Sequence, residues 1–151
     1  MTDAATVRRI TAEDFAAVSA LLAELGRPAI EPETEARVHA AFARLVADAN
    51  SAAMLAEAGG QPVGFCSLHF RDRFNHPTPE AWIPDLVVTE AARGTGAGKA
   101  LLQAAITEAR KRGCHNLTLE SGYSRQVAHR FYAMQGLADK GKYFAIDLMG
   151  Q

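Results

Sequence analysis

The chain has few cysteines, no excess of charge of one sign and no long apolar run. Its 151 residues include two cysteines, Cys66 and Cys114, too few for a disulfide framework. Sixteen basic and 17 acidic residues give a net charge of −1, which argues against a generally basic nucleic-acid-binding surface. No apolar run approaches the roughly 18 residues of a membrane span, and Met1–Arg9 lacks a signal-peptide pattern. We therefore expect a cytoplasmic protein that binds neither nucleic acid nor a membrane.

The remaining composition is that of an ordinary globular protein, with 48% hydrophobic and 22% charged residues. The length fits a single domain over residues 1–151, and such a domain buries about 70% of its unfolded surface without disulfide or metal cross-links. The five histidines show no metal-ligand spacing, so we expect no metal.

The hydrophobic periodicity predicts strands and helices in mixed order. Helices are expected to end at Gly26, Asp48, Gly113 and Gly136. Strands are expected over residues 7–10, 52–58, 62–70, 81–88, 116–119 and 143–148. Gly59-Gly60 favours an antiparallel hairpin, whereas the β-α-β unit over residues 86–119 favours parallel neighbours, so we predict one mixed sheet flanked by helices.

One predicted strand, residues 81–88, contains a proline. Pro84 has no N–H to donate to a neighbouring strand. It therefore belongs at a sheet edge, at a bulge or where two strands part.

A glycine-rich segment follows the apolar residues Leu86, Val87 and Val88 and precedes a predicted helix. The segment consists of Arg93, Gly94, Thr95, Gly96, Ala97, Gly98 and Lys99. Glycines at alternate positions permit a tight turn that directs several N–H groups to one point. The helix N-terminus behind them carries about half a positive charge. These features predict a site for a phosphate or pyrophosphate group.

Two other phosphate-binding motifs also contain spaced glycines. A P-loop is excluded, because Arg93 stands where its first glycine belongs and Ala100 follows Lys99. A dinucleotide fingerprint would use Glu120 as its acidic residue, but Lys99 occupies the place of its third glycine. A glycine-rich turn without a ligand stays open.

The same segment resembles the GCN5-related N-acetyltransferase (GNAT) superfamily. Residues 93–98 fit the pattern Arg/Gln-x-x-Gly-x-Gly/Ala directly after a Leu-Val-Val strand. About 35 residues later, Phe131-Tyr132 and Gly136-Leu137 fit the family's aromatic-Tyr-x-x-x-Gly-hydrophobic segment. The resemblance is clear over residues 80–148 and consistent over residues 5–71.

The resemblance implies an α/β (α+β) fold with a mixed central sheet and a V-shaped opening between its fourth and fifth strands, here 81–88 and 116–119. Acetyl-coenzyme A (acetyl-CoA) would lie in that opening as cosubstrate. Leu86, Val87 and Val88 would form backbone hydrogen bonds with the pantetheine arm. The pyrophosphate would be held at Arg93, Gly94, Thr95, Gly96, Ala97, Gly98 and Lys99.

The resemblance to the family also implies a general acid, and at one position this sequence differs from the family pattern. Tyr132 matches the tyrosine that commonly gives a proton to the leaving sulfur, and an O–H donor there would stabilise the thiolate. Many members carry Asn seven residues earlier to hold the pantetheine. This chain has Arg125 there, and an arginine can reach a phosphate or carbonyl oxygen instead.

The acceptor ammonium must lose a proton before its nitrogen attacks, and a carboxylate can take that proton. Asp85 and Glu120, at the two expected walls of the opening, are the main candidates, with Glu80 behind them. Which of them acts is left open. His69 and His76 flank a predicted loop, residues 71–79, that could line an acceptor pocket.

The predicted function is acetyl transfer from acetyl-CoA to an amine by direct attack in a ternary complex, since neither cysteine has a paired base. The segment from Glu120 to Tyr132 resembles members that act on small-molecule amines, some of them aminoglycosides. A non-catalytic acyl-CoA-binding module of the same fold is the alternative. The acceptor, the preferred acyl group and a homodimer stay open.

Overall fold

The computed structural model describes residues 4–149. The chain divides into two compact units, the first ending at Leu119 and the second beginning at Glu120. The first unit holds every strand and three of the four α-helices found among the described residues. The second unit holds the helix α4 (Gln126–Met134).

The strands of the first unit form two sheets rather than the single mixed sheet predicted. One sheet has the order β1-β2-β3-β6 and is antiparallel throughout. Its strands are β1 (Thr6–Arg9), β2 (Met54–Ala58), β3 (Gln61–Cys66) and β6 (Leu86–Val88). The other has the order β4-β5-β7, formed by β4 (His69–Arg71), β5 (Glu80–Ile83) and β7 (Asn116–Leu119). The predicted strands 62–70 and 81–88 are thus each divided between the two sheets.

The division falls at Ser67-Leu68 and at Pro84-Asp85, and its cause is local. Pro84 has no N–H, so the ladder cannot continue through it. Ser67 and Asp85 close the gap, because Ser67 N donates to Asp85 O (3.0 Å) and Asp85 N donates to Ser67 Oγ (2.9 Å). The proline predicted to sit at a bulge or a parting of strands is therefore found at such a break.

A parallel pair of strands was predicted for the β-α-β unit over residues 86–119. A parallel pair is present, but its first strand lies before residue 86. β5, not β6, lies parallel to β7, with Glu80 opposite Asn116 and Ile83 opposite Leu119. The pairing ends there, and among the described strands β6 pairs only with β3. β7 therefore pairs with β5 over four residues and does not continue along β6. Within residues 4–149, one edge of β6 is left without a partner strand.

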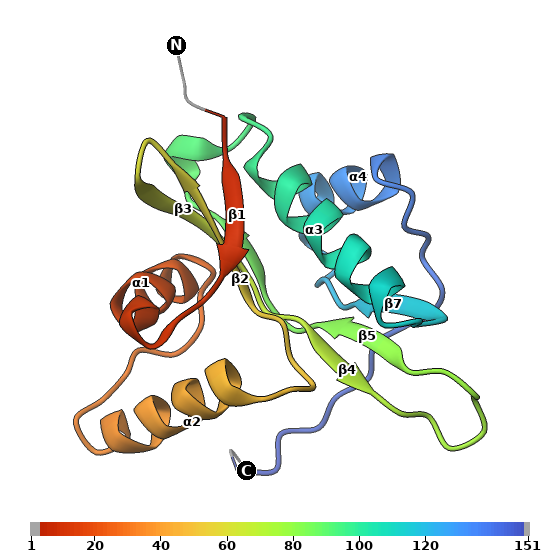
Figure 1. The fold of residues 1–151 in the computed structure, drawn as a ribbon, viewed down its shortest axis with the longest axis horizontal. Helices are drawn as coiled ribbons and strands as arrows, with labels where there is room; N and C mark the ends of the chain where they lie inside the picture. The colour runs from red at the N-terminus through yellow and green to blue at the C-terminus, as the bar shows by residue number, and fades with distance from the viewer. Residues whose placement is uncertain (1–3, 150–151) are drawn as a thin grey trace. The chain divides into compact units, whose positions relative to one another are not determined.

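Helices cover both faces of the four-stranded sheet. The first face carries α1 (Phe15–Glu24), whose Val18 and Leu21 are buried with Phe65 in the hydrophobic core. The other face carries α3 (Ala97–Lys111), which lies along the strands opposite α1 (Figure 1). Its approach is close: a Cβ on Gly64 would lie 2.9 Å from Leu101 Cδ1. The third helix is α2 (Glu35–Ala47).

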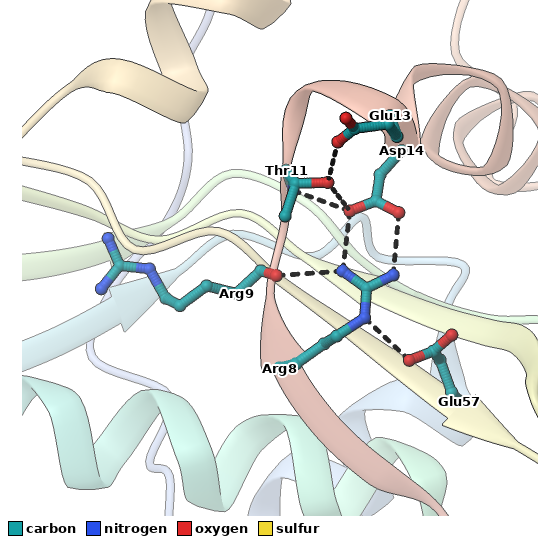
Figure 2. A network of polar contacts seen from close by, with 6 residues as sticks. All are labelled: Arg8, Arg9, Thr11, Glu13, Asp14 and Glu57. Atoms are coloured by element: carbon teal, nitrogen blue, oxygen red, sulfur yellow. Dashed lines mark hydrogen bonds and ion pairs between the residues drawn. The ribbon is translucent and has the colours of Figure 1, made fainter.

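A buried carboxylate links β1 to the start of α1. Asp14 is 8% exposed and accepts two hydrogen bonds of 2.8 Å from the Arg8 guanidinium and one of 2.7 Å from Thr11 N (Figure 2). Arg8 also donates to Glu57 (2.8 Å) on β2. The hydrogen bonds from Arg8 hold the pKa of Asp14 down at about 2. Asp14 is also the last residue of a short 3₁₀ turn, Ala12–Asp14, that comes directly before α1.

The predicted strand over residues 143–148 is not formed. In the second unit this segment pairs with no described strand, and Phe144 and Ile146 are more than 80% exposed. An apolar alternating run becomes a strand only when it finds a ladder partner. Val127 and Met134 on α4 are also exposed. Among the described residues, no helix is long and apolar enough to cross a bilayer.

Candidate active site

The glycine-rich segment forms a tight turn that leads into α3. Gly94 (φ +80°) and Gly96 (φ +92°) both adopt left-handed backbone conformations, which side chains with a Cβ rarely tolerate. Gly96 is the N-cap residue that directly precedes α3, and Ala100 N donates to its carbonyl oxygen (2.9 Å). The turn predicted from the alternate glycines is therefore present at the N-terminus of a 15-residue helix.

This turn offers several backbone donors. Within residues 4–149, no acceptor is found for the N–H groups of Gly94, Gly96, Ala97, Gly98 and Lys99. All of them except Ala97 and Gly98 belong to exposed residues, and the helix dipole places positive charge at the same point. Such an array suits an anionic group with several oxygen atoms.

The open edge of β6 continues from this turn. The hydrogen bonds from Ser67 N to Asp85 O (3.0 Å) and from Thr89 N to Val63 O (2.8 Å) set the phase of the β3–β6 ladder. Because backbone groups of an antiparallel strand alternate in direction, Val87 faces β3 while Leu86 and Val88 turn their N–H and C=O groups to the open edge. Arg93 Nε already donates to Val88 O (3.3 Å). Of the three predicted residues, Leu86 therefore has both backbone groups available for an extended ligand, and Val88 has its N–H.

Asp85 lies at the break before β6 and is held by two side chains. Its Oδ1 accepts a hydrogen bond from Arg27 Nε (2.7 Å), and its Oδ2 accepts one from Ser67 Oγ (3.2 Å). Arg27 also donates to Pro84 O (3.2 Å). The carboxylate thereby ties the segment after α1 to the β5–β6 break.

The other predicted carboxylates lie in different settings. Glu80 is 4% exposed on β5 and forms ion pairs with Arg71 (2.8 Å) and Arg73 (3.3 Å). These contacts anchor the loop between β4 and β5. Glu120 is exposed at the beginning of the second unit.

Tyr132 and Arg125 both belong to the second unit. Tyr132 is half-buried on α4, with its ring 5.6 Å from that of Phe131 in an edge-to-face arrangement. Arg125 is exposed and precedes the first residue of α4. Asp85 and the predicted coenzyme-binding residues of the first unit are thus gathered around β6 and the start of α3. In the second unit Tyr132 lies on α4, and Arg125 comes directly before that helix.

The cysteines are poor candidates for a covalent intermediate. Burial raises the pKa of Cys66 to about 12, and burial also raises the pKa of Cys114. A thiol that stays protonated near neutral pH is a weak nucleophile. Direct attack of the acceptor nitrogen, as predicted, needs neither of them.

Sequence reasoning did not identify Arg27 or Ser67. Arg27 reaches across 58 positions to Asp85, and a single charged residue after a helix gives no sign of such a partner. Ser67 lay inside a predicted strand. Only the position of Pro84 indicated that the backbone would need an additional donor or acceptor there.

Comparisons with known proteins found similarities in both sequence and fold. The model of the acetyltransferase (GNAT) family matches residues 17–137. An aminoalkylphosphonate N-acetyltransferase of Salmonella typhimurium (strain LT2) is 34% identical over 130 residues, which cover 86% of this chain and 82% of the relative. An aminoglycoside N(6')-acetyltransferase type 1 of Stenotrophomonas maltophilia is 30% identical over 151 residues, covering 96% of this chain and 95% of the relative.

A solved structure extends the similarity to the whole fold. The crystal structure of a transcriptional regulator from Bacillus halodurans C-125 superposes with a TM-score of 0.85 at 28% sequence identity. The match covers 95% of this chain and 99% of that one.

Proposed function

The chain belongs to the acetyltransferase (GNAT) family, and from that premise we propose that it transfers the acetyl group of acetyl-CoA to the nitrogen of a small-molecule amine. The chain is an acetyltransferase, and its named relatives transfer acetyl to nitrogen. Those relatives act on an aminoalkylphosphonate and an aminoglycoside, which supports a small amine as the acceptor here.

The observation that carries the proposal is the array of donors from β6 to α3. The pantetheine arm contains amide groups, which suit the outward backbone groups of Leu86 and Val88. The pyrophosphate suits the N–H groups of the turn from Gly94 to Lys99, beside Arg93. We treat residues 1–151 as one functional domain, because the family model spans the boundary between the two units.

Coenzyme binding is tested by thermal unfolding with coenzyme A, ATP and NAD in turn. A ligand that binds only the folded state raises Tm in proportion to the logarithm of its concentration. We expect coenzyme A to raise Tm most. Stabilisation by NAD without stabilisation by coenzyme A would contradict the proposal.

We propose Tyr132 as the acid that gives a proton to the departing thiolate. Changing Tyr132→Phe should lower kcat by about 10²-fold, because general acids contribute about that much or more, while the Kd for acetyl-CoA changes little. The measurement is steady-state thiol release together with calorimetric coenzyme binding. An unchanged kcat would show that Tyr132 is not the acid.

Asp85 and Glu120 are the two carboxylate candidates for the group that takes the proton from the ammonium. Both oxygens of Asp85 already accept hydrogen bonds, which favours a role in holding Arg27 and the β5–β6 break. Asp85→Asn and Glu120→Gln, assayed separately with the acceptor present, distinguish a carboxylate that takes the proton from one that only positions the chain.

One observation favours a second candidate, a module that binds acyl-CoA without transferring the acyl group. The Bacillus halodurans structure carries the name of a transcriptional regulator. A module of that kind would bind coenzyme A and release no thiol with any amine. A panel of amines assayed for thiol release separates the two candidates.

A further inference from the structure

A hollow lies between α2 and β4, on a part of the first unit that the proposed coenzyme contacts do not use. Its volume is about 530 Å³, and its lining combines three apolar residues with two charged ones and a histidine. These residues are Ala41, Arg44, Leu45, Ala47, Asp48 and His69.

Three polar side chains are connected in series at this hollow. Asp48 follows the last residue of α2, and its Oδ2 accepts a hydrogen bond from Ser51 Oγ (3.0 Å). Ser51 is 1% exposed and forms an antiparallel bridge with His69 at the start of β4. Ser51 Oγ lies 3.2 Å from His69 Nδ1.

The direction of the hydrogen bonds between Asp48, Ser51 and His69 determines which ring nitrogen of His69 can accept a proton. A serine hydroxyl has one proton, and Ser51 gives it to the Asp48 carboxylate. The contact between Ser51 Oγ and His69 Nδ1 is then a hydrogen bond only if Nδ1 carries the proton. The lone pair of the neutral ring therefore resides on Nε2, for which no partner is found within residues 4–149.

The surroundings keep His69 neutral near pH 7. Burial lowers the pKa of His69, and Arg71 acts in the same direction, whereas Asp48 and Asp85 oppose them. Arg44 is the other charged residue that lines the hollow. Hydrogen bonds from Asn50 N and Ser51 Oγ lower the pKa of Asp48, so that carboxylate stays charged.

The row of side chains continues from His69 across the three-stranded sheet. Trp82 lies opposite His69, with ring centroids 5.8 Å apart, and Thr118 lies opposite Trp82. Trp82 Nε1 and Thr118 Oγ1 are buried and have no hydrogen-bond partner within the described chain. Each unpaired buried group costs roughly 1–3 kcal/mol, so this row is a place where a polar ligand would be favoured.

We propose that His69, in place of the candidate carboxylates Asp85 and Glu120, takes the proton from the acceptor ammonium. Ser51 and Asp48 act as positioning residues, and the acceptor amine enters the hollow between α2 and β4. The inference rests on the proposed function. His69 stands in register with Trp82, two residues before Pro84, and therefore close to the β5–β6 break where the coenzyme edge begins.

The transfer balances with His69 in this role. The ammonium gives one proton to Nε2, and the freed nitrogen lone pair forms the C–N bond while the C–S bond breaks. The departing thiolate gains a proton, and the second nitrogen proton balances it. His69 releases its proton to water, so each acetyl transferred yields an amide, a thiol and one proton.

The test compares the unsubstituted chain with His69→Gln and with the control His39→Gln, using an aminoalkylphosphonate and an aminoglycoside as probes. Protonation of His69 should cause kcat to fall with decreasing pH, with a midpoint below 6.5. We expect His69→Gln to lose about 10²-fold in kcat together with this acid limb, while binding acetyl-CoA as before. His39→Gln should leave both unchanged, because His39 stacks on Phe15 away from the hollow.

A second measurement does not depend on activity. Long-range ¹⁵N correlation spectra of the free protein should show the His69 ring protonated at Nδ1, and Ser51→Ala should change that tautomer ratio. A ring protonated at Nε2, or His69→Gln with kcat within threefold and an unchanged pH profile, overturns the inference while leaving the proposed function intact. No transfer to either amine by the unsubstituted chain overturns both.

Discussion

At the scale of single residues, Asp14 shows how a buried charge contributes to stability. Its pKa is depressed to about 2 from an ordinary 3.8 by the Arg8 hydrogen bonds. A depressed pKa stabilises the fold above pH 3.8, and that contribution is lost as pH falls towards 2. At one pKa unit per 1.4 kcal/mol, it amounts to roughly 2 kcal/mol for this mostly buried carboxylate.

We therefore predict that Asp14→Asn lowers the free energy of unfolding by roughly 2 kcal/mol at pH 7 and by little near pH 2. Urea unfolding at several pH values provides the measurement. Glu13→Gln is the matched control, because that neighbouring carboxyl is exposed and accepts a hydrogen bond from the Thr11 hydroxyl rather than from an arginine. Equal effects of Asp14→Asn at pH 2 and pH 7 would contradict the assignment.

At the scale of elements, the turn before α3 depends on backbone conformation rather than on space. A Cβ at Gly96 would meet no atom within 4 Å, so only its φ of +92° requires glycine. Gly113, at the other end of α3, has the same property with a φ of +74°. The two glycines therefore form a matched pair, one at the proposed phosphate site and one remote from it.

Gly96→Ala and Gly113→Ala should each lower the free energy of unfolding by about 1 kcal/mol, because each places a Cβ in a left-handed conformation. Only Gly96→Ala should also weaken coenzyme A binding, by up to about tenfold, as strain shifts the N–H groups of the turn. Calorimetric titration of both variants measures this. Equal coenzyme affinity in the two variants would contradict the role of the turn.

The elements that were predicted correctly from sequence are those determined by residues close together in the chain. The helices follow from apolar spacing and from glycines at their ends, and the turn before α3 follows from three alternating glycines. Pro84 predicted a break in its strand for a reason that lies within one residue. Ser67 and Arg27 form the hydrogen bonds at this break. They are distant in sequence from Asp85, so hydrophobic periodicity cannot predict these contacts.

At the scale of the whole molecule, sequence periodicity described segments but not their partners. The strand predicted over residues 143–148 has a suitable pattern, yet a strand exists only with a neighbour. The carboxylates Asp85 and Glu80 were identified as candidates, but their arginine partners were not. The sequence thus indicated the candidate carboxylates, but it did not indicate the arginines that form ion pairs with them.

Backbone protection should differ across the molecule accordingly. Hydrogen exchange followed by mass spectrometry should show slow exchange in β2 and β3, whose Leu55 and Phe65 are 1% exposed, and fast exchange over residues 143–148. The reason is that a segment without a ladder has no cooperative unit to protect it. Slow exchange over residues 143–148 would show that the strand predicted from sequence does form.

The central claim, acetyl transfer from acetyl-CoA to a small amine, is tested most directly by following thiol release and the acetylated product in one reaction. The purified chain is mixed with acetyl-CoA and a panel of amines that includes an aminoalkylphosphonate and an aminoglycoside. We predict one thiol released for each N-acetylated amine formed, and no such release without the amine. Binding of coenzyme A with no thiol released by any amine would contradict the account.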